Sequence, residues 1–164
     1  MKLTGTSSDA VQKLTYGITG LGSTKATLLW PWYLSCLAWA HATLGRHDEA
    51  WRCIGEAIAL IETGKEQWCE AEVHRVAGEM ALLLPTPDAP KAKTYFERSL
   101  KIARDQQAKS WELRAAMSMA RLWRDEGKRD HARDLLAPVY AWFTEGFDTL
   151  DLKQAKALLD ELAR

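Results

Sequence analysis

The sequence predicts an all-α protein built from repeated helical hairpins, and two observations support this fold class. Apolar residues recur at helical spacing along nearly the whole chain, and no long segment alternates with a period of two residues. Glycine and proline stand mainly between these periodic blocks, where helices are expected to end. The second observation is a short pattern that occurs four times: a small residue, an apolar residue four positions later, and a small or apolar residue seven positions later.

The four copies of this pattern lie at nearly constant intervals. Their first members are separated by 40, 42 and 40 residues, which indicates a tandem array. Small residues at such positions allow a neighbouring helix to approach closely. The copies are Ala10, Leu14 and Gly17; Ala50, Ile54 and Ala57; Ala92, Phe96 and Ser99; and Ala132, Leu136 and Val139.

A second amphipathic helix precedes each of the last three copies, with a small residue of its own at position 38, 78 or 120. Each unit is therefore predicted to be a helical hairpin, and the array to form a single domain over residues 1–164. Its parts are a half repeat and linker (7–27), three repeats (28–66, 67–107 and 108–147) and a capping helix (148–164).

The predicted turns carry the residues that helix ends require. Gly45 and Gly127 are placed to adopt the left-handed conformation that ends a helix. The middle turn is two residues longer, and there Asp88 can cap the next helix while Pro90 occupies its first turn. The last helix can be capped by Asp148 or Thr149; its apolar stripe would be Leu152, Ala155, Leu159 and Leu162, and its polar face Lys153, Lys156, Asp160 and Glu161.

These motifs together resemble the tetratricopeptide repeat (TPR). The resemblance implies a right-handed α-solenoid, although units near 40 residues exceed the usual length of about 34 and lack the proline at the end of the unit. Such long units are similar to those in the C-terminal regions of bacterial signalling ATPases, including adenylate cyclase-associated proteins and transcription activators of the maltose-regulator type. The likeness is strongest from Ala108 to Leu162. It implies that the chain is a C-terminal part of a larger protein that extends upstream of Met1.

Composition excludes several classes of function. Lys plus Arg and Asp plus Glu both number 22, so no global field favours nucleic acid or an anionic membrane surface. No secretory signal is recognisable, which makes the cytoplasm the expected compartment. Residues 26–45 carry no formal charge, but Pro31 and His41 and the scattered tryptophans argue against a membrane span. Cys36, Cys53 and Cys69 lack Cys-x-x-Cys spacing and are expected to be reduced core thiols.

Two stretches imitate active sites, and neither predicts one. Residues 44–57 hold His47, Asp48, Glu49 and Cys53, but consecutive residues at a helix start point apart and acidic side chains there complement the helix dipole. Residues 17–27 resemble a phosphate-binding loop, yet Lys25 does not directly follow the last glycine. His41 and His74 are read as satisfied packing histidines. We therefore expect no catalytic residue, no metal site and no cofactor, and hence no enzyme.

A binding surface is expected on the first helices of the hairpins, which line the concave groove in TPR arrays. Trp and Arg dominate binding hot spots, and we expect most of the eight tryptophans to be in the core but Trp32 and Trp39 to face the groove. In the alternative, longer helices rotate these residues, so that Trp39 is core and the charges form a solvated face. The groove positions carried over are Trp32, Ser35, Trp39, Glu72, Arg75, Glu79, Arg114, Met117 and Arg121.

The leading functional hypothesis is a non-enzymatic scaffold that binds a protein or peptide partner in this groove. A small-molecule-sensing helical-repeat domain or a small α-helical enzyme is the alternative, and it would need a closed pocket. A homodimer formed through the uncapped N-terminal repeat face is a third hypothesis.

Overall fold

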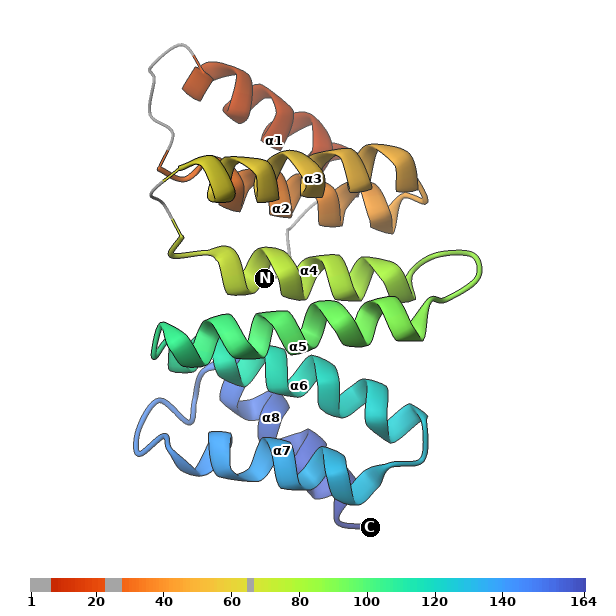
Figure 1. The fold of residues 1–164 in the computed structure, drawn as a ribbon, viewed down its shortest axis with the longest axis vertical. Helices are drawn as coiled ribbons and strands as arrows, with labels where there is room; N and C mark the ends of the chain where they lie inside the picture. The colour runs from red at the N-terminus through yellow and green to blue at the C-terminus, as the bar shows by residue number, and fades with distance from the viewer. Residues whose placement is uncertain (1–6, 23–27, 65–66) are drawn as a thin grey trace.

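A computed structural model describes residues 7–22, 28–64 and 67–164, and this part of the chain is all-α, as predicted (Figure 1). It contains eight helices and no strand among the described residues. The helices are α1 (Ser7–Gly22), α2 (Trp30–Thr43), α3 (His47–Thr63), α4 (Glu70–Leu82), α5 (Ala89–Asp105), α6 (Lys109–Asp125), α7 (Arg129–Ala141) and α8 (Leu150–Leu162).

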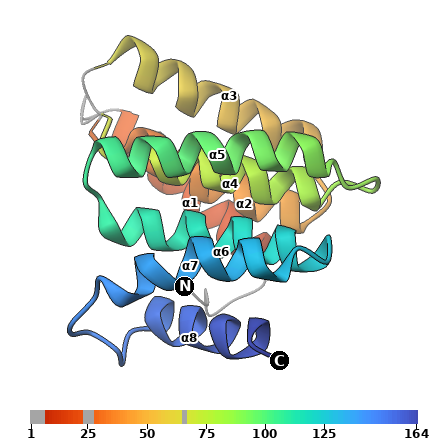
Figure 2. The same ribbon diagram turned by 60° about the horizontal axis from the view of Figure 1, so that its bottom comes forward.

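Successive helices pack as pairs, and the pairs follow one another along the long axis of the molecule (Figure 1). The strongest packing joins α2 to α3, α4 to α5, and α6 to α7. Helices α2, α4, α6 and α8 also contact each other in that order, whereas no such backbone contact joins α3 to α5 or α5 to α7 within the described part. We call α2, α4, α6 and α8 the even-helix row. Figure 2 shows α5 and α7 in front of this row, with α8 at the end of the stack.

The repeated small and apolar residues hold the pairs together. All nine residues of the last three copies are buried. The Ser99 hydroxyl of α5 also donates a hydrogen bond to the Ala71 carbonyl of α4, at 2.6 Å. Gly78 permits the closest approach, since a Cβ atom there would lie 2.6 Å from Cδ1 of Phe96. In the first copy, Leu14 is half-buried and Gly17 is exposed, and the side chain of Ala10 lies outside the described residues.

The predicted turn chemistry is largely confirmed. Gly45 and Gly127 have φ angles of +72° and +78°, the left-handed conformation that glycine adopts without steric cost. The Asp88 carboxylate accepts a hydrogen bond from the Lys91 amide at 2.9 Å, and Pro90 occupies the first turn of α5.

The last helix differs in two details from the prediction. Thr149 is its N-cap residue, but the Thr149 hydroxyl donates to the carbonyl of Gly146 instead of accepting a bond from the helix. Leu158 is buried with Leu152, Ala155 and Leu162, whereas the predicted Leu159 is only partly buried. The buried face of the helix therefore includes position 158 in place of the predicted position 159. The four residues of the predicted polar face are exposed, as expected: Lys153, Lys156, Asp160 and Glu161.

The expectation that most tryptophans form the core is wrong. None of the eight is fully buried, and Trp39, Trp68 and Trp142 are exposed. The close approach of helices at small residues leaves room mainly for alanine, aliphatic side chains and the ring of Phe96. Indoles are therefore placed at the margins of the core.

The predicted uncharged segment 26–45 does not form a long apolar helix. Its described portion contains α2, which is 14 residues long. None of the helices that the structure describes has both the length and the apolar character needed to cross a membrane.

Candidate functional site

The nine predicted groove residues all lie on the even-helix row, three each on α2, α4 and α6. Within each helix they are spaced by three and four residues, a spacing that places them on one face. Their environments differ, however. Some join an ion-pair network, some are buried, and two have no hydrogen-bond, ion-pair or ring partner among the described residues.

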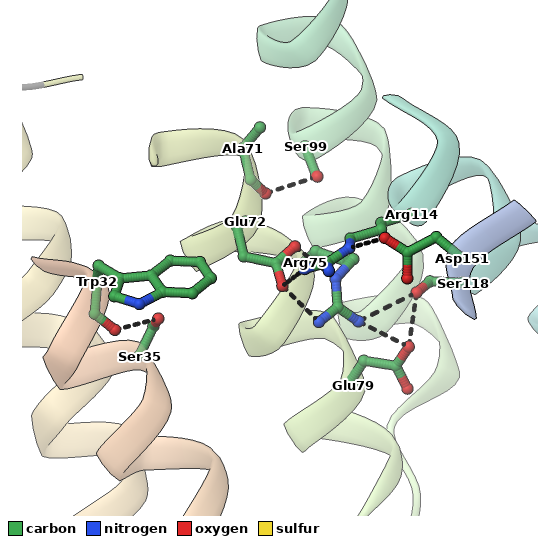
Figure 3. Close-up of polar contacts among 10 residues, drawn as sticks. All are labelled: Trp32, Ser35, Ala71, Glu72, Arg75, Glu79, Ser99, Arg114, Ser118 and Asp151. Atoms are coloured by element: carbon green, nitrogen blue, oxygen red, sulfur yellow. Dashed lines mark hydrogen bonds and ion pairs between the residues drawn. The ribbon is translucent and has the colours of Figure 1, made fainter. Parts of the chain in front are cut away.

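The ion-pair network is centred on Arg75 and Glu72 of α4 (Figure 3). Arg75 donates two hydrogen bonds to the Glu72 carboxylate, from Nε at 2.7 Å and from Nη2 at 2.8 Å. Glu72 is only 4% exposed, so this two-pronged pairing compensates for the loss of water around its charge. Burial alone would lower the pKa of Arg75, but the hydrogen bond and the charge of Glu72 outweigh it and raise that pKa.

The network extends from α4 to α6 and α8. Arg114 of α6 donates to Glu72 at 3.3 Å and, through Nε, to Asp151 of α8 at 2.7 Å. Ser118 of α6 donates to Glu79 of α4 at 2.6 Å, and the same oxygen of Glu79 lies 3.3 Å from Nη1 of Arg75. These contacts link three helices of the row through charged side chains (Figure 3).

Aromatic side chains lie beside this network. The Trp32 ring centroid is 5.6 Å from that of Trp111 and 5.9 Å from that of Trp68. The guanidinium carbon of Arg114 lies 5.2 Å from the Trp111 centroid, within range of a cation–π interaction. Because no backbone contact joins α2 to α6 in the described part of the chain, Trp32 and Trp111 meet across the intervening α4.

Besides Glu72 of the network, two of the predicted groove residues are buried and offer no binding surface. Ser35 is 1% exposed and its hydroxyl donates to the Trp32 carbonyl at 2.7 Å. Met117 is 3% exposed and belongs to the hydrophobic core. Because both side chains are buried, a groove ligand would not reach them.

Trp39 and Arg121 are the predicted groove residues that lack such internal partners. Trp39 is 39% exposed, so the alternative that places it in the core is wrong. Arg121 is half-buried and makes no hydrogen bond or ion pair with any described residue. The alternative of a solvated charged face is also wrong for Glu72, which is buried, and for Arg75, whose side chain is 19% exposed.

The histidines pack as predicted but are not fully satisfied. His74 is buried and stacks on Tyr95 with a centroid distance of 6.0 Å. The Nδ1 atoms of His74 and of the half-buried His41 have no hydrogen-bond partner among the described residues. Burial, followed by the positive charge of Arg98, lowers the pKa of His74 to about 4. The ring is therefore neutral at pH 7.

The polar stretch of residues 44–57 forms a helix end, a turn and the first part of α3. Asp48 and Glu49 lie in the first turn of α3. Cys53 is half-buried and its thiol pKa is raised by burial. Over residues 7–22, 28–64 and 67–164, no three His, Cys, Asp or Glu side chains are grouped so that they could hold a metal ion.

An open depression of about 330 Å³ lies on the α5, α6 and α7 side of the molecule. Its charged residues are already paired, Lys101 with Asp105 at 2.6 Å and Arg104 with Glu112 at 2.9 Å. The remaining lining residues are mostly apolar: Leu100, Met119, Trp123 and Leu135, with Glu97 at the margin. The depression therefore does not supply the closed pocket that the small-molecule hypothesis needs.

Sequence reasoning missed three participants in the network region: Ser118, Asp151 and Trp111. Ser118 lies four residues after Arg114, on the same face of the helix, and could have been included from spacing alone. Asp151 was expected only to belong to a capping helix.

Comparisons of the chain with protein-family models, with curated proteins and with solved structures gave no match. The geometry of the even-helix row is therefore the basis for a functional proposal.

Proposed function

We propose that the protein is a non-enzymatic TPR-like scaffold that binds a protein or peptide partner along the even-helix row. The proposal includes a right-handed solenoid arrangement and a role as the regulatory C-terminal part of a larger signalling ATPase or nucleotide cyclase. The partner would contact the row where its side chains are not already engaged with one another.

One observation carries the proposal. The even-helix row is a continuous series of neighbouring helices, and its side-chain surface includes an exposed tryptophan, Trp39, and a half-buried arginine, Arg121, that has no partner among the described residues. Tryptophan and arginine are the residue types most enriched at binding hot spots. The ion-pair network contributes rigidity, because it links α4, α6 and α8 and leaves few of its charges free.

A comparison of two tryptophan variants tests this proposal. The purified chain would be used to recover binding partners from a cell lysate as wild type, Trp39→Ala and Trp142→Ala, with quantification by mass spectrometry. Trp142 is a matched control because it is 58% exposed but lies after α7, outside the row. Removing a hot-spot tryptophan costs about 2 kcal/mol or more, which corresponds to roughly 30-fold weaker binding. We expect Trp39→Ala to lose partners that Trp142→Ala retains.

Equal partner profiles for the three proteins would reject the row as the binding surface. Arg75→Ala is not a suitable probe of binding, since it would leave the buried Glu72 carboxylate poorly paired and would change stability.

A thermal-shift screen with nucleotides and metabolites addresses the sensor hypothesis. A ligand that raises the melting temperature in proportion to its occupancy would favour a sensor over a scaffold.

The link to a larger signalling protein has a separate test. The native reading frame upstream of Met1 would be sequenced from the source genome. An ATPase or cyclase domain encoded in frame would support the regulatory role, and a stop codon directly upstream would contradict it.

A further inference from the structure

The end of the molecule at which the even helices begin exposes most of the large apolar side chains of the described residues. The beginnings of α2, α4, α6 and α8 lie together, on the left in Figure 1. We call this end, with the connections that lead into these helices, the entry end. The turns at the opposite end expose only Leu44 and Leu83 among the described large apolar residues. Six of the eleven exposed ones belong to the entry end: Leu28, Leu29, Trp68, Trp142, Phe147 and Leu150.

Hydrogen bonds place successive connections of the entry end side by side. Trp68 donates from Nε1 to the carbonyl of Leu28 at 3.2 Å, which joins the segment before α4 to the segment before α2. The Gln106 side chain donates from Nε2 to the carbonyl of Gln67 at 2.8 Å, which joins the segment before α6 to the segment before α4. The entry end is therefore one edge of the molecule and not a set of separate loops.

The α7–α8 connection continues this edge and is held in place by its own contacts. Lys109 Nζ, at the start of α6, lies 5.7 Å from the centroid of the Trp142 ring. The exposed Phe147 ring lies beside the half-buried Tyr140, with centroids 5.9 Å apart. Gly146 turns the chain between them with a φ of +75°, which glycine adopts without steric cost. The exposed rings are thus preorganised, which lowers the entropy that docking of a partner would cost.

The α7–α8 connection is negatively charged. Residues 142–149 include Glu145 and Asp148 and no Lys, Arg or His. Both carboxylates are exposed, and neither makes a hydrogen bond or ion pair with a described residue. Lys109, which reaches the connection from α6, is engaged with Glu112 at 2.7 Å. No ion pair joins either carboxylate to Lys153, the next base along the described chain. Two free carboxylates therefore accompany the exposed apolar side chains of this connection.

We propose that the entry end, at the α7–α8 connection, docks an amphipathic segment of a partner protein that carries Lys or Arg beside apolar side chains. Exposed apolar patches with a polar border mark interaction sites, and complementary charge selects the segment that docks. The proposal goes beyond the proposed function, because Trp39 and Arg121 lie in the second halves of α2 and α6, away from this end. A lipid surface fits less well, since the two carboxylates would have to approach the apolar layer together with the rings.

Designed peptides test the proposal. The main probe is a fluorescently labelled peptide of about four helical turns, with leucine on one face and lysine on the other. One control peptide has glutamate in place of lysine, and a second has serine in place of leucine. Affinities would be measured by fluorescence anisotropy. We expect the leucine–lysine peptide to bind wild type about 10-fold or more tightly than either control peptide.

Two pairs of substitutions locate the binding surface. Glu145→Lys combined with Asp148→Lys should weaken binding of the leucine–lysine peptide about 10-fold or more, and should increase binding of the leucine–glutamate peptide. Phe147→Ser combined with Leu150→Ser should weaken binding of the leucine–lysine peptide by a similar factor. Circular dichroism would verify that both proteins keep their helices.

Matched pairs elsewhere on the chain serve as controls. Asp48→Lys with Glu56→Lys produces the same change of net charge on α3, where both side chains are exposed. Leu44→Ser with Leu83→Ser removes exposed apolar side chains at the opposite end. Both control proteins should bind the leucine–lysine peptide as wild type does. A control pair that weakens binding as much as its matched pair would overturn the proposal, because general charge or general hydrophobicity would then explain the binding.

Other outcomes separate this proposal from the proposed function. Trp39→Ala should bind the leucine–lysine peptide normally, whereas Trp142→Ala should lose it and keep the partners of the even-helix row. Peptide binding that depends on Trp39, or no binding to wild type, would overturn the proposal and leave the row as a binding surface. Binding to neutral phosphatidylcholine vesicles that depends on Phe147 and Leu150, without peptide binding, would also overturn it.

A further measurement does not require any variant to fold. Backbone amide chemical shifts of isotope-labelled wild type would be followed as the leucine–lysine peptide is added. We expect the largest changes within residues 142–150, and weaker binding at high salt because exposed charges are then screened. Changes concentrated on α3 or around Trp39 would contradict the proposal.

Discussion

Burial of His74 makes the stability of the protein depend on pH in a defined range. Burial and the charge of Arg98 lower the pKa of His74 to about 4 in the folded chain, against an ordinary value of 6.5. Between these two values the unfolded chain binds a proton that the folded chain does not. Stability is therefore fully present above pH 6.5 and falls as the pH is lowered towards 4.

The size of this effect follows from the two pKa values. One pKa unit corresponds to about 1.36 kcal/mol, so His74 lowers the free energy of unfolding by about 3 kcal/mol once the pH is well below 4. About 2 kcal/mol of this loss falls between pH 7 and pH 5. The ring is 3% exposed, so solvent screening reduces the value little.

His74→Leu isolates the contribution of the histidine. Leucine fills a similar buried volume beside Tyr95 and does not titrate, whereas Glu70, 3.9 Å from the ring, and Arg98 are present in both proteins. The free energy of unfolding would be measured by urea titration, monitored by circular dichroism, at pH 7 and pH 5. We expect the wild type to lose about 2 kcal/mol more than His74→Leu over this interval. Equal losses in the two proteins would refute the reasoning, because His74 would then titrate alike in the folded and unfolded chains.

Two further predictions concern helix packing and the ion-pair network. Gly78→Ala should lower the free energy of unfolding, since overpacking against the buried Phe96 ring costs about 1–3 kcal/mol and exceeds the gain in helix propensity of about 1 kcal/mol. Gly55→Ala should instead raise it by about 0.5–1 kcal/mol, because a Cβ there meets no atom within 4 Å. Arg75→Ala should cost about 3 kcal/mol by leaving the buried Glu72 carboxylate without its main partner. Adding Glu72→Gln to Arg75→Ala should recover part of this loss. Each value would be obtained from urea unfolding at pH 7.

Matched controls define the outcomes that would contradict these predictions. If Gly78→Ala were as stabilising as Gly55→Ala, α4 and α5 would not approach as closely as Phe96 implies. Arg133→Ala removes an exposed pair with Asp130 and should change stability by less than about 1 kcal/mol. If Arg75→Ala cost no more than Arg133→Ala, the network would not be desolvated.

The repeat spacing of the sequence was sufficient to predict the helical pairs and their contact residues. Ala50, Ile54 and Ala57 are buried because a pattern of period 3.6 places them on one side of α3. Gly45 and Asp88 were predictable for a similar reason, since the chemistry of a turn or a cap depends on residues a few positions apart. Such features are local, and the same rules apply in any helical protein.

The candidate site was predictable only in outline. Spacing placed the nine residues on one row of helices, but not their state of burial, which separates Trp39 from Ser35 on the same helix. Small rotations of a helix about its axis decide which of two neighbouring positions is covered. The sequence does not specify these rotations, because they result from packing against two neighbours at once.

The sequence by itself determined that this chain is all-α, where its helices pair and which small residues separate them, since all three depend on patterns within about 40 residues. Only the tertiary structure decided that Arg114 of α6 pairs with Glu72 of α4 and Asp151 of α8, and that Arg121 pairs with no carboxylate of the described residues. The physical reason is the length of arginine and carboxylate side chains. Long charged side chains can contact several helices, and the choice among carboxylates depends on distances between elements that lie far apart in the sequence.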